Sequence, residues 1–124
     1  MSVNLNRTGG LEPPKTTLLD STSAIEVFAS SILYGRSVET IIIANIDTTN
    51  AINVTLEWVD ATPTAHLFYF KEIPAKDTVI ISEIPILAQG TGTVRSIKAT
   101  ASAANKIYIT AISSAQTKQS PVAG

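Results

Sequence analysis

Apolar and polar residues alternate with a period of two through the centre of this chain, which is the pattern of β-strands that bury one face. The clearest case is INVTLEWV at residues 52–59, where the even-numbered positions are apolar and most odd-numbered positions are polar. The pattern predicts a strand whose apolar face, which includes Trp58, lies in the core.

A second strand is predicted at residues 38–46, VETIIIANI, which are β-branched and apolar on both faces, as in a strand that is covered on both sides. The link between the two strands is Asp47-Thr48-Thr49-Asn50, whose side chains suit a tight connection. We therefore expect the two strands to form an antiparallel hairpin.

Six more segments have a strand pattern, the last two of them weaker: residues 66–71, 78–83, 93–100, 106–112, 16–20 and 24–29. They are bounded by turn residues, among them Pro63, Pro74, Pro85 and Gly90-Thr91-Gly92, the last of which we interpret as a hairpin turn. The segment 100–105 is too short to nucleate a helix alone, so a loop is expected there. Seven or eight short strands without a convincing helix predict an all-β protein, an antiparallel β-sandwich of jelly-roll type.

The two ends of the chain lack this periodicity. Residues 1–15, MSVNLNRTGGLEPPK, are irregular, and residues 113–124, SSAQTKQSPVAG, are small and polar. Neither end has enough apolar residues to offset the entropy of ordering by local burial. We predict an extended N-terminal arm at 1–15, a β-sandwich domain at 16–112 and a C-terminal tail at 113–124.

Composition excludes several classes of protein. A length of 124 residues suits one domain, and a net charge of -1 provides no long-range attraction to nucleic acid or to an anionic membrane. The absence of cysteine removes disulfides and thiolate chemistry. No apolar run approaches the ~20 residues of a membrane helix, and the N-terminus lacks the apolar centre of a secretory signal. We expect a soluble intracellular product with no nucleic-acid or membrane partner.

Candidate catalytic residues are few. His66 is the one histidine, and a relay with Asp60 would need a serine in a nucleophile-elbow sequence, which the chain lacks. A zinc site on His66, Asp60 and Glu57 would lack convergent ligand spacing, so His66 is expected to be a strand or rim residue. Glu39, Glu57 and Glu72 are better explained as solvent-facing charges than as a glycosidase pair. The chain is therefore expected to be no enzyme and to bind no cofactor or metal.

The strand at 66–71 has apolar residues on both faces, with Phe68 and Phe70 on one side and Leu67 and Tyr69 on the other. A small sandwich offers one inner face per sheet, so the second apolar face must meet an arm, a loop or another subunit. A row of exposed rings would instead indicate a carbohydrate-binding module, and this alternative stays open.

Residues 38–112 resemble a class of small virion proteins of tailed bacteriophages. The similarity rests on a β-rich strand ending in AN, an Asx- and Thr-rich turn, a VTLEW strand, and the later stretches IPA, PIL and IKATASAAN. Proteins of this class are capsid cement (decoration) proteins or neck and tail accessory proteins, so the resemblance implies no cofactor and no catalytic residues. The arm, the tail and the turn Ala88-Gln89-Gly90-Thr91-Gly92 depart from the shorter members of the class.

The resemblance and the surplus of apolar strand faces together predict a capsid cement protein that stabilises a phage head by bridging capsid subunits. It would lie on the capsid surface of the virion after synthesis in the host cytoplasm. Its expected partners are the major capsid protein and further copies of itself, with a trimer preferred, and a neck or tail accessory protein stays open. The residues predicted to bind the partner lie in the arm and the tail: Leu5, Leu11, Pro13, Pro14 and Val122.

Overall fold

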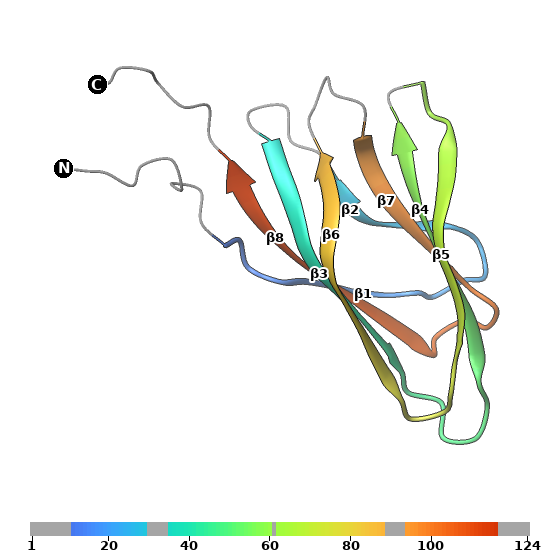
Figure 1. The fold of residues 1–124 in the computed structure, drawn as a ribbon. Helices are drawn as coiled ribbons and strands as arrows, with labels where there is room; N and C mark the ends of the chain where they lie inside the picture. The colour runs from blue at the N-terminus through green and yellow to red at the C-terminus, as the bar shows by residue number, and fades with distance from the viewer. Residues whose placement is uncertain (1–10, 30–34, 61, 89–93, 117–124) are drawn as a thin grey trace, which may run out of the picture.

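A computed structural model describes residues 11–29, 35–60, 62–88 and 94–116 (Figure 1). These residues form strands and loops without a helix, and so contain no helix that could cross a membrane. The strands are β1 (Lys15–Leu18), β2 (Ile25–Ala29), β3 (Gly35–Asn45), β4 (Ile52–Asp60), β5 (Ala65–Ile73), β6 (Thr78–Ala88), β7 (Val94–Ala101) and β8 (Ile107–Gln116). Every segment that the sequence predicted as a strand, including the two weaker ones, overlaps one of them.

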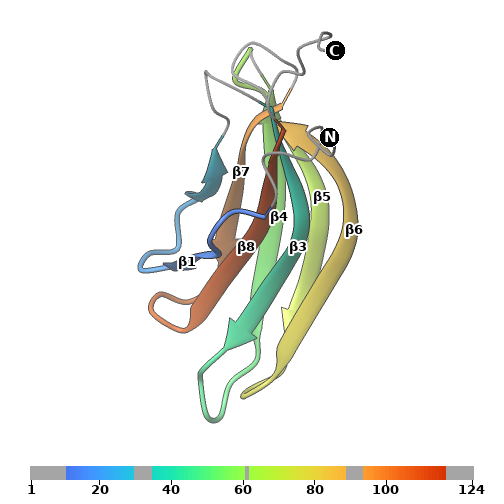
Figure 2. The same ribbon diagram turned by 90° about the vertical axis from the view of Figure 1, so that its left-hand side faces the viewer.

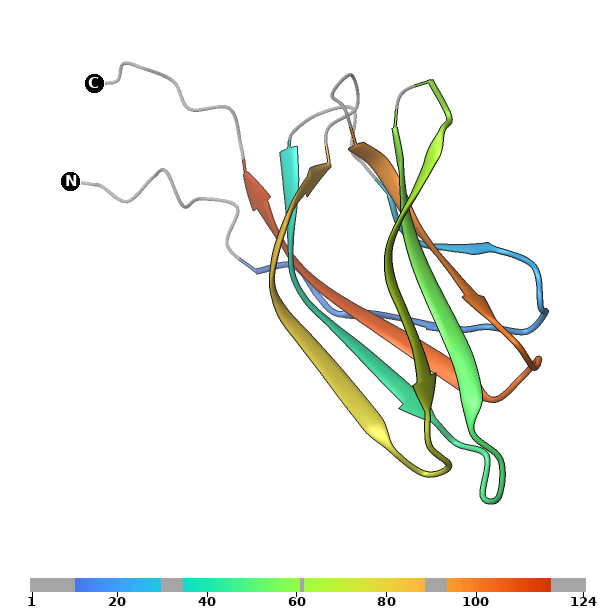
Figure 3. The same ribbon diagram turned by 45° about the vertical axis from the view of Figure 1, so that its right-hand side comes forward.

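The strands pair in the nested order of a jelly roll. Antiparallel ladders join β1 to β8, β2 to β7, β3 to β6 and β4 to β5, and two further ladders join β3 to β8 and β4 to β7. The result is a sandwich of two four-stranded sheets, β1-β8-β3-β6 and β2-β7-β4-β5, with one parallel bridge between Ala88 and Val94 (Figures 2 and 3). The predicted antiparallel β-sandwich of jelly-roll type is confirmed.

The predicted hairpin between residues 38–46 and 52–59 is wrong. Both strands exist, but β3 and β4 belong to different sheets and the connection at residues 46–51 crosses between them. A hairpin would have placed the two apolar strands in one sheet, whereas the crossover places Ile43 and Val54, both fully buried, on facing inner surfaces. The strands that flank Gly90-Thr91-Gly92 are likewise not a hairpin, because their one pairing is parallel; residues 90–92 themselves lie outside the described residues.

The core is made of apolar side chains from the inner faces of both sheets. Its largest fully buried members are Phe28, Leu19, Ile41, Ile43, Leu56, Ile73, Ile97, Ile107, Ile109, Val27, Val38 and Val54. Trp58 shares their phase but is only partly buried, packed against the margin of the core. The prediction that it lies wholly between the sheets is therefore corrected; one face of the indole stacks on His66 of the neighbouring strand β5.

A bulge changes the faces predicted for β5. Leu56 is opposite Tyr69 but Glu57 is opposite Leu67, so one extra residue, Phe68, is inserted. As a result Phe68 and Tyr69 both pack against the core, while Leu67 and Phe70 are both exposed. The pairing Phe68 with Phe70 and Leu67 with Tyr69, which assumed unbroken alternation, is wrong.

The sandwich extends further along the chain than the predicted strand ends. β8 continues to Gln116, where Ser113, Ser114 and Ala115 pair with β3. β6 runs through Pro85 instead of ending before it, since the register with β3 shifts there and a residue without an N–H is tolerated at such an irregularity. The division into arm, domain and tail stays a prediction.

Candidate functional site

The central rows of the outer surface of sheet β1-β8-β3-β6 carry no charge and are here called the uncharged face; the exposed Glu39, which accepts a hydrogen bond from the Ser114 hydroxyl at 2.7 Å, follows the last of these rows on β3. Thr16, Thr110, Ile42 and Ile80 lie side by side across its four strands. The adjoining rows add apolar or hydroxyl side chains: Leu18, Tyr108, Ala44, Thr78, Ile112, Thr40 and Ser82. None of these eleven residues is charged, and Ile80 is 65% exposed. The sequence predicted that both faces of β3 are covered. In this chain the prediction holds for the inner face, where Ile41 and Ile43 are buried, but Ile42 on the outer face is only partly covered.

The outer surface of the other sheet differs in charge. Glu26, Lys98 and Glu57 lie in one row across β2, β7 and β4, with alternating sign. Opposite charges in register stabilise a sheet that faces water. Along β2, β7 and β4 this surface is suited to solvent, whereas β5 at its edge exposes Leu67 and Phe70.

Residues 11–14, here called the strap, lie along the end of β8. Leu11 forms a bridge with Ser114, and the Glu12 N–H donates to the Ser113 carbonyl at 2.8 Å. Pro13 and Pro14 have no N–H, so they cannot donate to the ladder that β1 resumes at Lys15. The strap continues the edge of the sheet with an interrupted ladder.

The Glu12 side chain fastens the strap to both sheets. Its Oε1 accepts hydrogen bonds from Arg36 Nε at 2.9 Å and from the hydroxyl of Ser113, which is buried, at 2.6 Å. The Arg36 guanidinium lies over the Phe28 ring, 4.4 Å from its centroid, and Nη1 donates to the Ala29 carbonyl. One carboxylate therefore connects the strap to β8 and β3 and, through Arg36, to β2.

The predicted partner-binding residues fall partly on this strap. Leu11 is 72% exposed, and Pro13 and Pro14 are also exposed, so all three are accessible. Leu5 and Val122 lie outside the described residues. The binding role of all five stays a prediction. Sequence reasoning missed Glu12, Arg36 and Ser113; the isolated acidic residue within an apolar, proline-containing stretch was the available signal.

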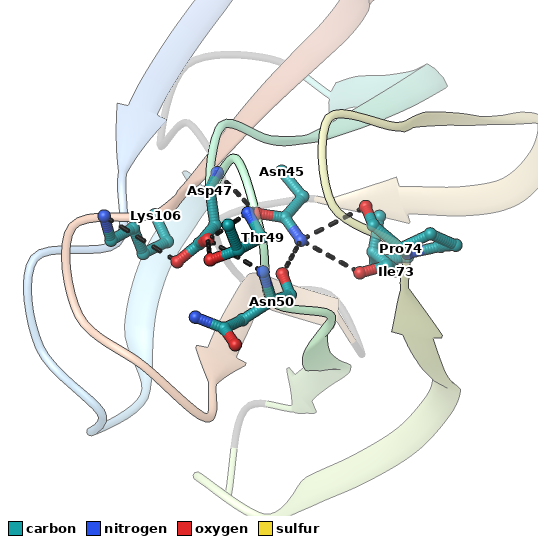
Figure 4. A network of polar contacts seen from close by, with 7 residues as sticks. All are labelled: Asn45, Asp47, Thr49, Asn50, Ile73, Pro74 and Lys106. Atoms are coloured by element: carbon teal, nitrogen blue, oxygen red, sulfur yellow. Dashed lines mark hydrogen bonds and ion pairs between the residues drawn. The ribbon is translucent and has the colours of Figure 1, made fainter.

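The crossover from β3 to β4 is organised by Asn45 (Figure 4). Its side-chain amide donates to the carbonyls of Asn50, Ile73 and Pro74 at 3.0, 2.9 and 3.2 Å, and its Oδ1 accepts from the Asp47 N–H at 2.9 Å. Asn45 is 2% exposed. It thus joins the end of β3 to the end of β5, which belongs to the other sheet.

Asp47 closes the same loop. Its Oδ1 accepts from the backbone N–H groups of Thr49 and Asn50, both at 2.8 Å, and its Oδ2 lies 3.7 Å from Lys106 Nζ. The hydrogen bonds from the Thr49 and Asn50 backbones stabilise the carboxylate and lower the pKa of Asp47 from 3.8 to about 2. The Asx- and Thr-rich stretch is a folded crossover stabilised by a charged carboxylate.

His66 is a strand residue at the margin, as expected. Its ring stacks on Trp58 with centroids 4.1 Å apart, and its Nε2 lies 2.9 Å from Asp60 Oδ2. Asp60 also accepts from the Thr62 hydroxyl at 2.6 Å, and the hydrogen bonds from Thr62 and His66 hold the pKa of Asp60 well below its usual range. These contacts close the turn between β4 and β5.

The other candidate groups do not converge. Glu39 is on β3, whereas Glu57 and Glu72 are on β4 and β5 of the opposite sheet. No group of three His, Cys, Asp or Glu residues within the described ranges could hold a metal ion. The Tyr69 hydroxyl is buried without a hydrogen-bond partner, and burial raises the pKa of this phenol.

No protein-family model matches the sequence, and no curated protein matches it either. Solved structures of similar fold include a Bacillus endospore appendage that forms disulfide-linked pili, with 11% identity over 96% of this chain and 98% of that one, and a TM-score of 0.47. The Drosophila NLP-core has 10% identity over 84% and 97% of the two chains, and the cyanophage Pam1 capsid has 13% over 92% and 91%, each with a TM-score of 0.47. Likeness at this level does not decide function.

Proposed function

We propose that this chain is a non-enzymatic structural protein of a virus particle, most specifically a capsid cement protein that bridges capsid subunits as a homo-oligomer. The uncharged face carries this proposal. It has exposed Ile80 next to half-covered Ile42, and its hydroxyl groups can pair with a facing surface. An apolar surface of this kind on a sheet typically marks a contact with protein.

The size of the face argues for more than one contact. Four strands about 4.8 Å apart, each with about five residues, outline roughly 300 Å². A standard interface buries about 800 Å² per partner. The face therefore needs help from other surfaces, and the exposed strap residues Leu11, Pro13 and Pro14 supply candidates at its edge.

In this proposal the uncharged face packs against further copies of the chain, with a trimer preferred, and the arm and tail lie along the major capsid protein. Each linked contact then acts at an effective concentration of order mM, so individually weak contacts hold tightly. No cofactor, nucleic acid or membrane takes part.

The experiment compares Ile80→Lys with Thr100→Lys, which adds the same charge to the opposite outer face. Light scattering at micromolar concentration is expected to give a mass above the 13.1 kDa monomer for the unmodified chain and for Thr100→Lys, and a lower mass for Ile80→Lys. Equal self-association of the two variants, or a strict monomer throughout, would contradict the role of the face. Labelling of this chain on intact particles then tests its location. Label on the capsid surface supports a cement protein, whereas label at the neck or tail would show that the chain is an accessory protein instead.

The carbohydrate-binding alternative needs a row of exposed rings. Among the described residues, Phe70 and Tyr108 are exposed, but they lie on β5 and β8, in different sheets. They do not form such a row, so this alternative is not pursued.

A further inference from the structure

We propose that residues 11–19 exchange between copies of this chain, so that the strap and β1 of one copy pair with β8 of another. This inference concerns contacts between copies and does not depend on the virion role. Exchange of an identical element is a low-cost route to oligomers because both states contain the same contacts.

The first observation is that this segment is held at the edge of the sheet, by the β1–β8 ladder, the Glu12 hydrogen bonds and a single core side chain. β1 is a four-residue edge strand whose one ladder is with β8, and residues 11–18 contain no fully buried side chain. Leu19, by contrast, is completely buried and bonds to Ile107 and Asn105 through its backbone. Segments with few buried contacts open at low free energy, so residues 11–18 can leave β8 readily, and Leu19 is the one core side chain that the exchange must bury again in the neighbouring copy.

The second observation identifies the occupant of the opened edge. Lys15, Thr16, Thr17 and Leu18 match Ala111, Thr110, Ile109 and Tyr108 in register, and the Glu12 carboxylate fits between Arg36 and Ser113. A second copy carries the same nine residues, so it fits this edge without a change in any side chain. A different peptide would have to supply both the register and the carboxylate.

The third observation is a suitable hinge. The connection from Asp20 to Ala24 is polar and mostly exposed, and its side-chain hydrogen bond to another described residue is local, from the Ser23 N–H to the Ser21 hydroxyl at 3.0 Å. It can extend and deliver Leu19 together with β1 to a neighbour. Repeated around three copies, the exchange closes a ring in which each domain is completed by the next.

The absence of cysteine permits a direct test. Leu11 and Ser114 form an antiparallel bridge, so their Cα atoms are about 5 Å apart, within disulfide range. A tagged Leu11→Cys chain and an untagged Ser114→Cys chain are refolded together and oxidised. Exchange is expected to give a covalent heterodimer that reduction reverses. Pairing with Ser102→Cys, at an exposed position in the β7–β8 loop and so at the other end of β8 from Ser114, controls for random collision.

A second pair, Thr16→Cys with Thr110→Cys, repeats the test on β1 itself, where the two hydroxyls are 2.9 Å apart. It covers the case in which either first variant fails to fold. In a double variant the two cysteines of a pair are placed in one chain, where closed monomers form an internal disulfide. The proposal is overturned if both double variants form this internal disulfide and neither pair of separate chains gives more covalent heterodimer than the Ser102→Cys control.

A rate measurement separates exchange from fixed dimerisation. Arg36→Met removes one charged hydrogen bond from Glu12 in both the closed and the exchanged state, so it should raise the exchange rate about tenfold while the final heterodimer fraction is unchanged. Lys98→Met makes the same charge change on the other sheet and should leave the rate within about twofold. An unaltered rate for Arg36→Met would show that the strap does not control exchange.

Discussion

Asn45 at the end of β3 donates its side-chain amide to the carbonyl of Ile73 at the end of β5, 2.9 Å away, and so links the two sheets. The same amide also donates to the carbonyls of Asn50 and Pro74, the second of which accepts from the Asp77 N–H as well. The route of the chain from one sheet to the other rests on this buried group.

Replacement of Asn45 by alanine is therefore expected to lower the free energy of unfolding by about 2–4 kcal/mol, since the buried bonds to the Ile73 carbonyl and from the Asp47 N–H are both lost. Urea denaturation followed by circular dichroism measures the change. Asn53→Ala, at an exposed position on β4, should change stability by no more than about 0.5 kcal/mol. Equal effects of the two substitutions would mean that the crossover network contributes little.

Acid stability should depend on Asp47 and Asp60. Both carboxyls have a folded-state pKa below the usual value, about 2 for Asp47 against 3.8, so the unfolded chain binds protons first as the pH falls. Their contribution is complete above about pH 5 and is lost as the pH falls towards 2. The thermal midpoint of the unmodified protein should decrease across this window.

The variant Asp47→Asn should be less stable than the unmodified chain at pH 6 and should show a shallower decline between pH 5 and 2. Asp20→Asn serves as the control, because it removes an exposed carboxylate and changes the net charge by the same amount. Parallel curves for Asp47→Asn and the unmodified protein would refute the assignment.

Trp58 should report on the margin of the sandwich. Because its ring is partly buried, Trp58→Ala is expected to cost about 2–3 kcal/mol, less than the roughly 3–5 kcal/mol for the fully buried Phe28→Ala. His66→Ala uncovers the stacked face and should increase acrylamide quenching of Trp58, whereas Lys71→Ala on the same strand should not. Quenching unaffected by loss of His66 would place the accessible part of the indole elsewhere.

A chain of residues 11–116 should keep the far-ultraviolet spectrum and thermal midpoint of the full chain, because it retains the strap and all eight strands that the structure describes. A chain of residues 16–112 should be clearly less stable, since it loses Lys15, Glu12 and Ser113. If the proposed arm contacts hold, particles lacking this protein bind the 11–116 chain much more weakly than the full chain. Undiminished binding would assign attachment to the sandwich itself.

Most of the strand positions followed from the alternation of residues, because burial of one face imposes a period of two. The fold class followed as well, since eight short strands in one domain leave few other arrangements. The strap contacts did not follow, because Glu12 and Ser113 are 101 positions apart and only the β1–β8 pairing brings them together. The exposed pair Leu67 and Phe70 depended on a bulge that no residue pattern marked.

Periodicity states which side chains share a face, and for this chain it placed Val54 and Leu56 in the core without a structure, but it did not separate the buried Ile41 and Ile43 from the half-covered Ile42. It is silent on which strand is the neighbour, and the choice between a hairpin at residues 46–51 and a crossover was made by the tertiary structure alone. The crossover prevails because it lets both apolar strands bury their inner faces against each other's sheets. It also gives the Asn45 amide three carbonyls, two of them from a segment 28 and 29 residues away, which no local pattern could reveal.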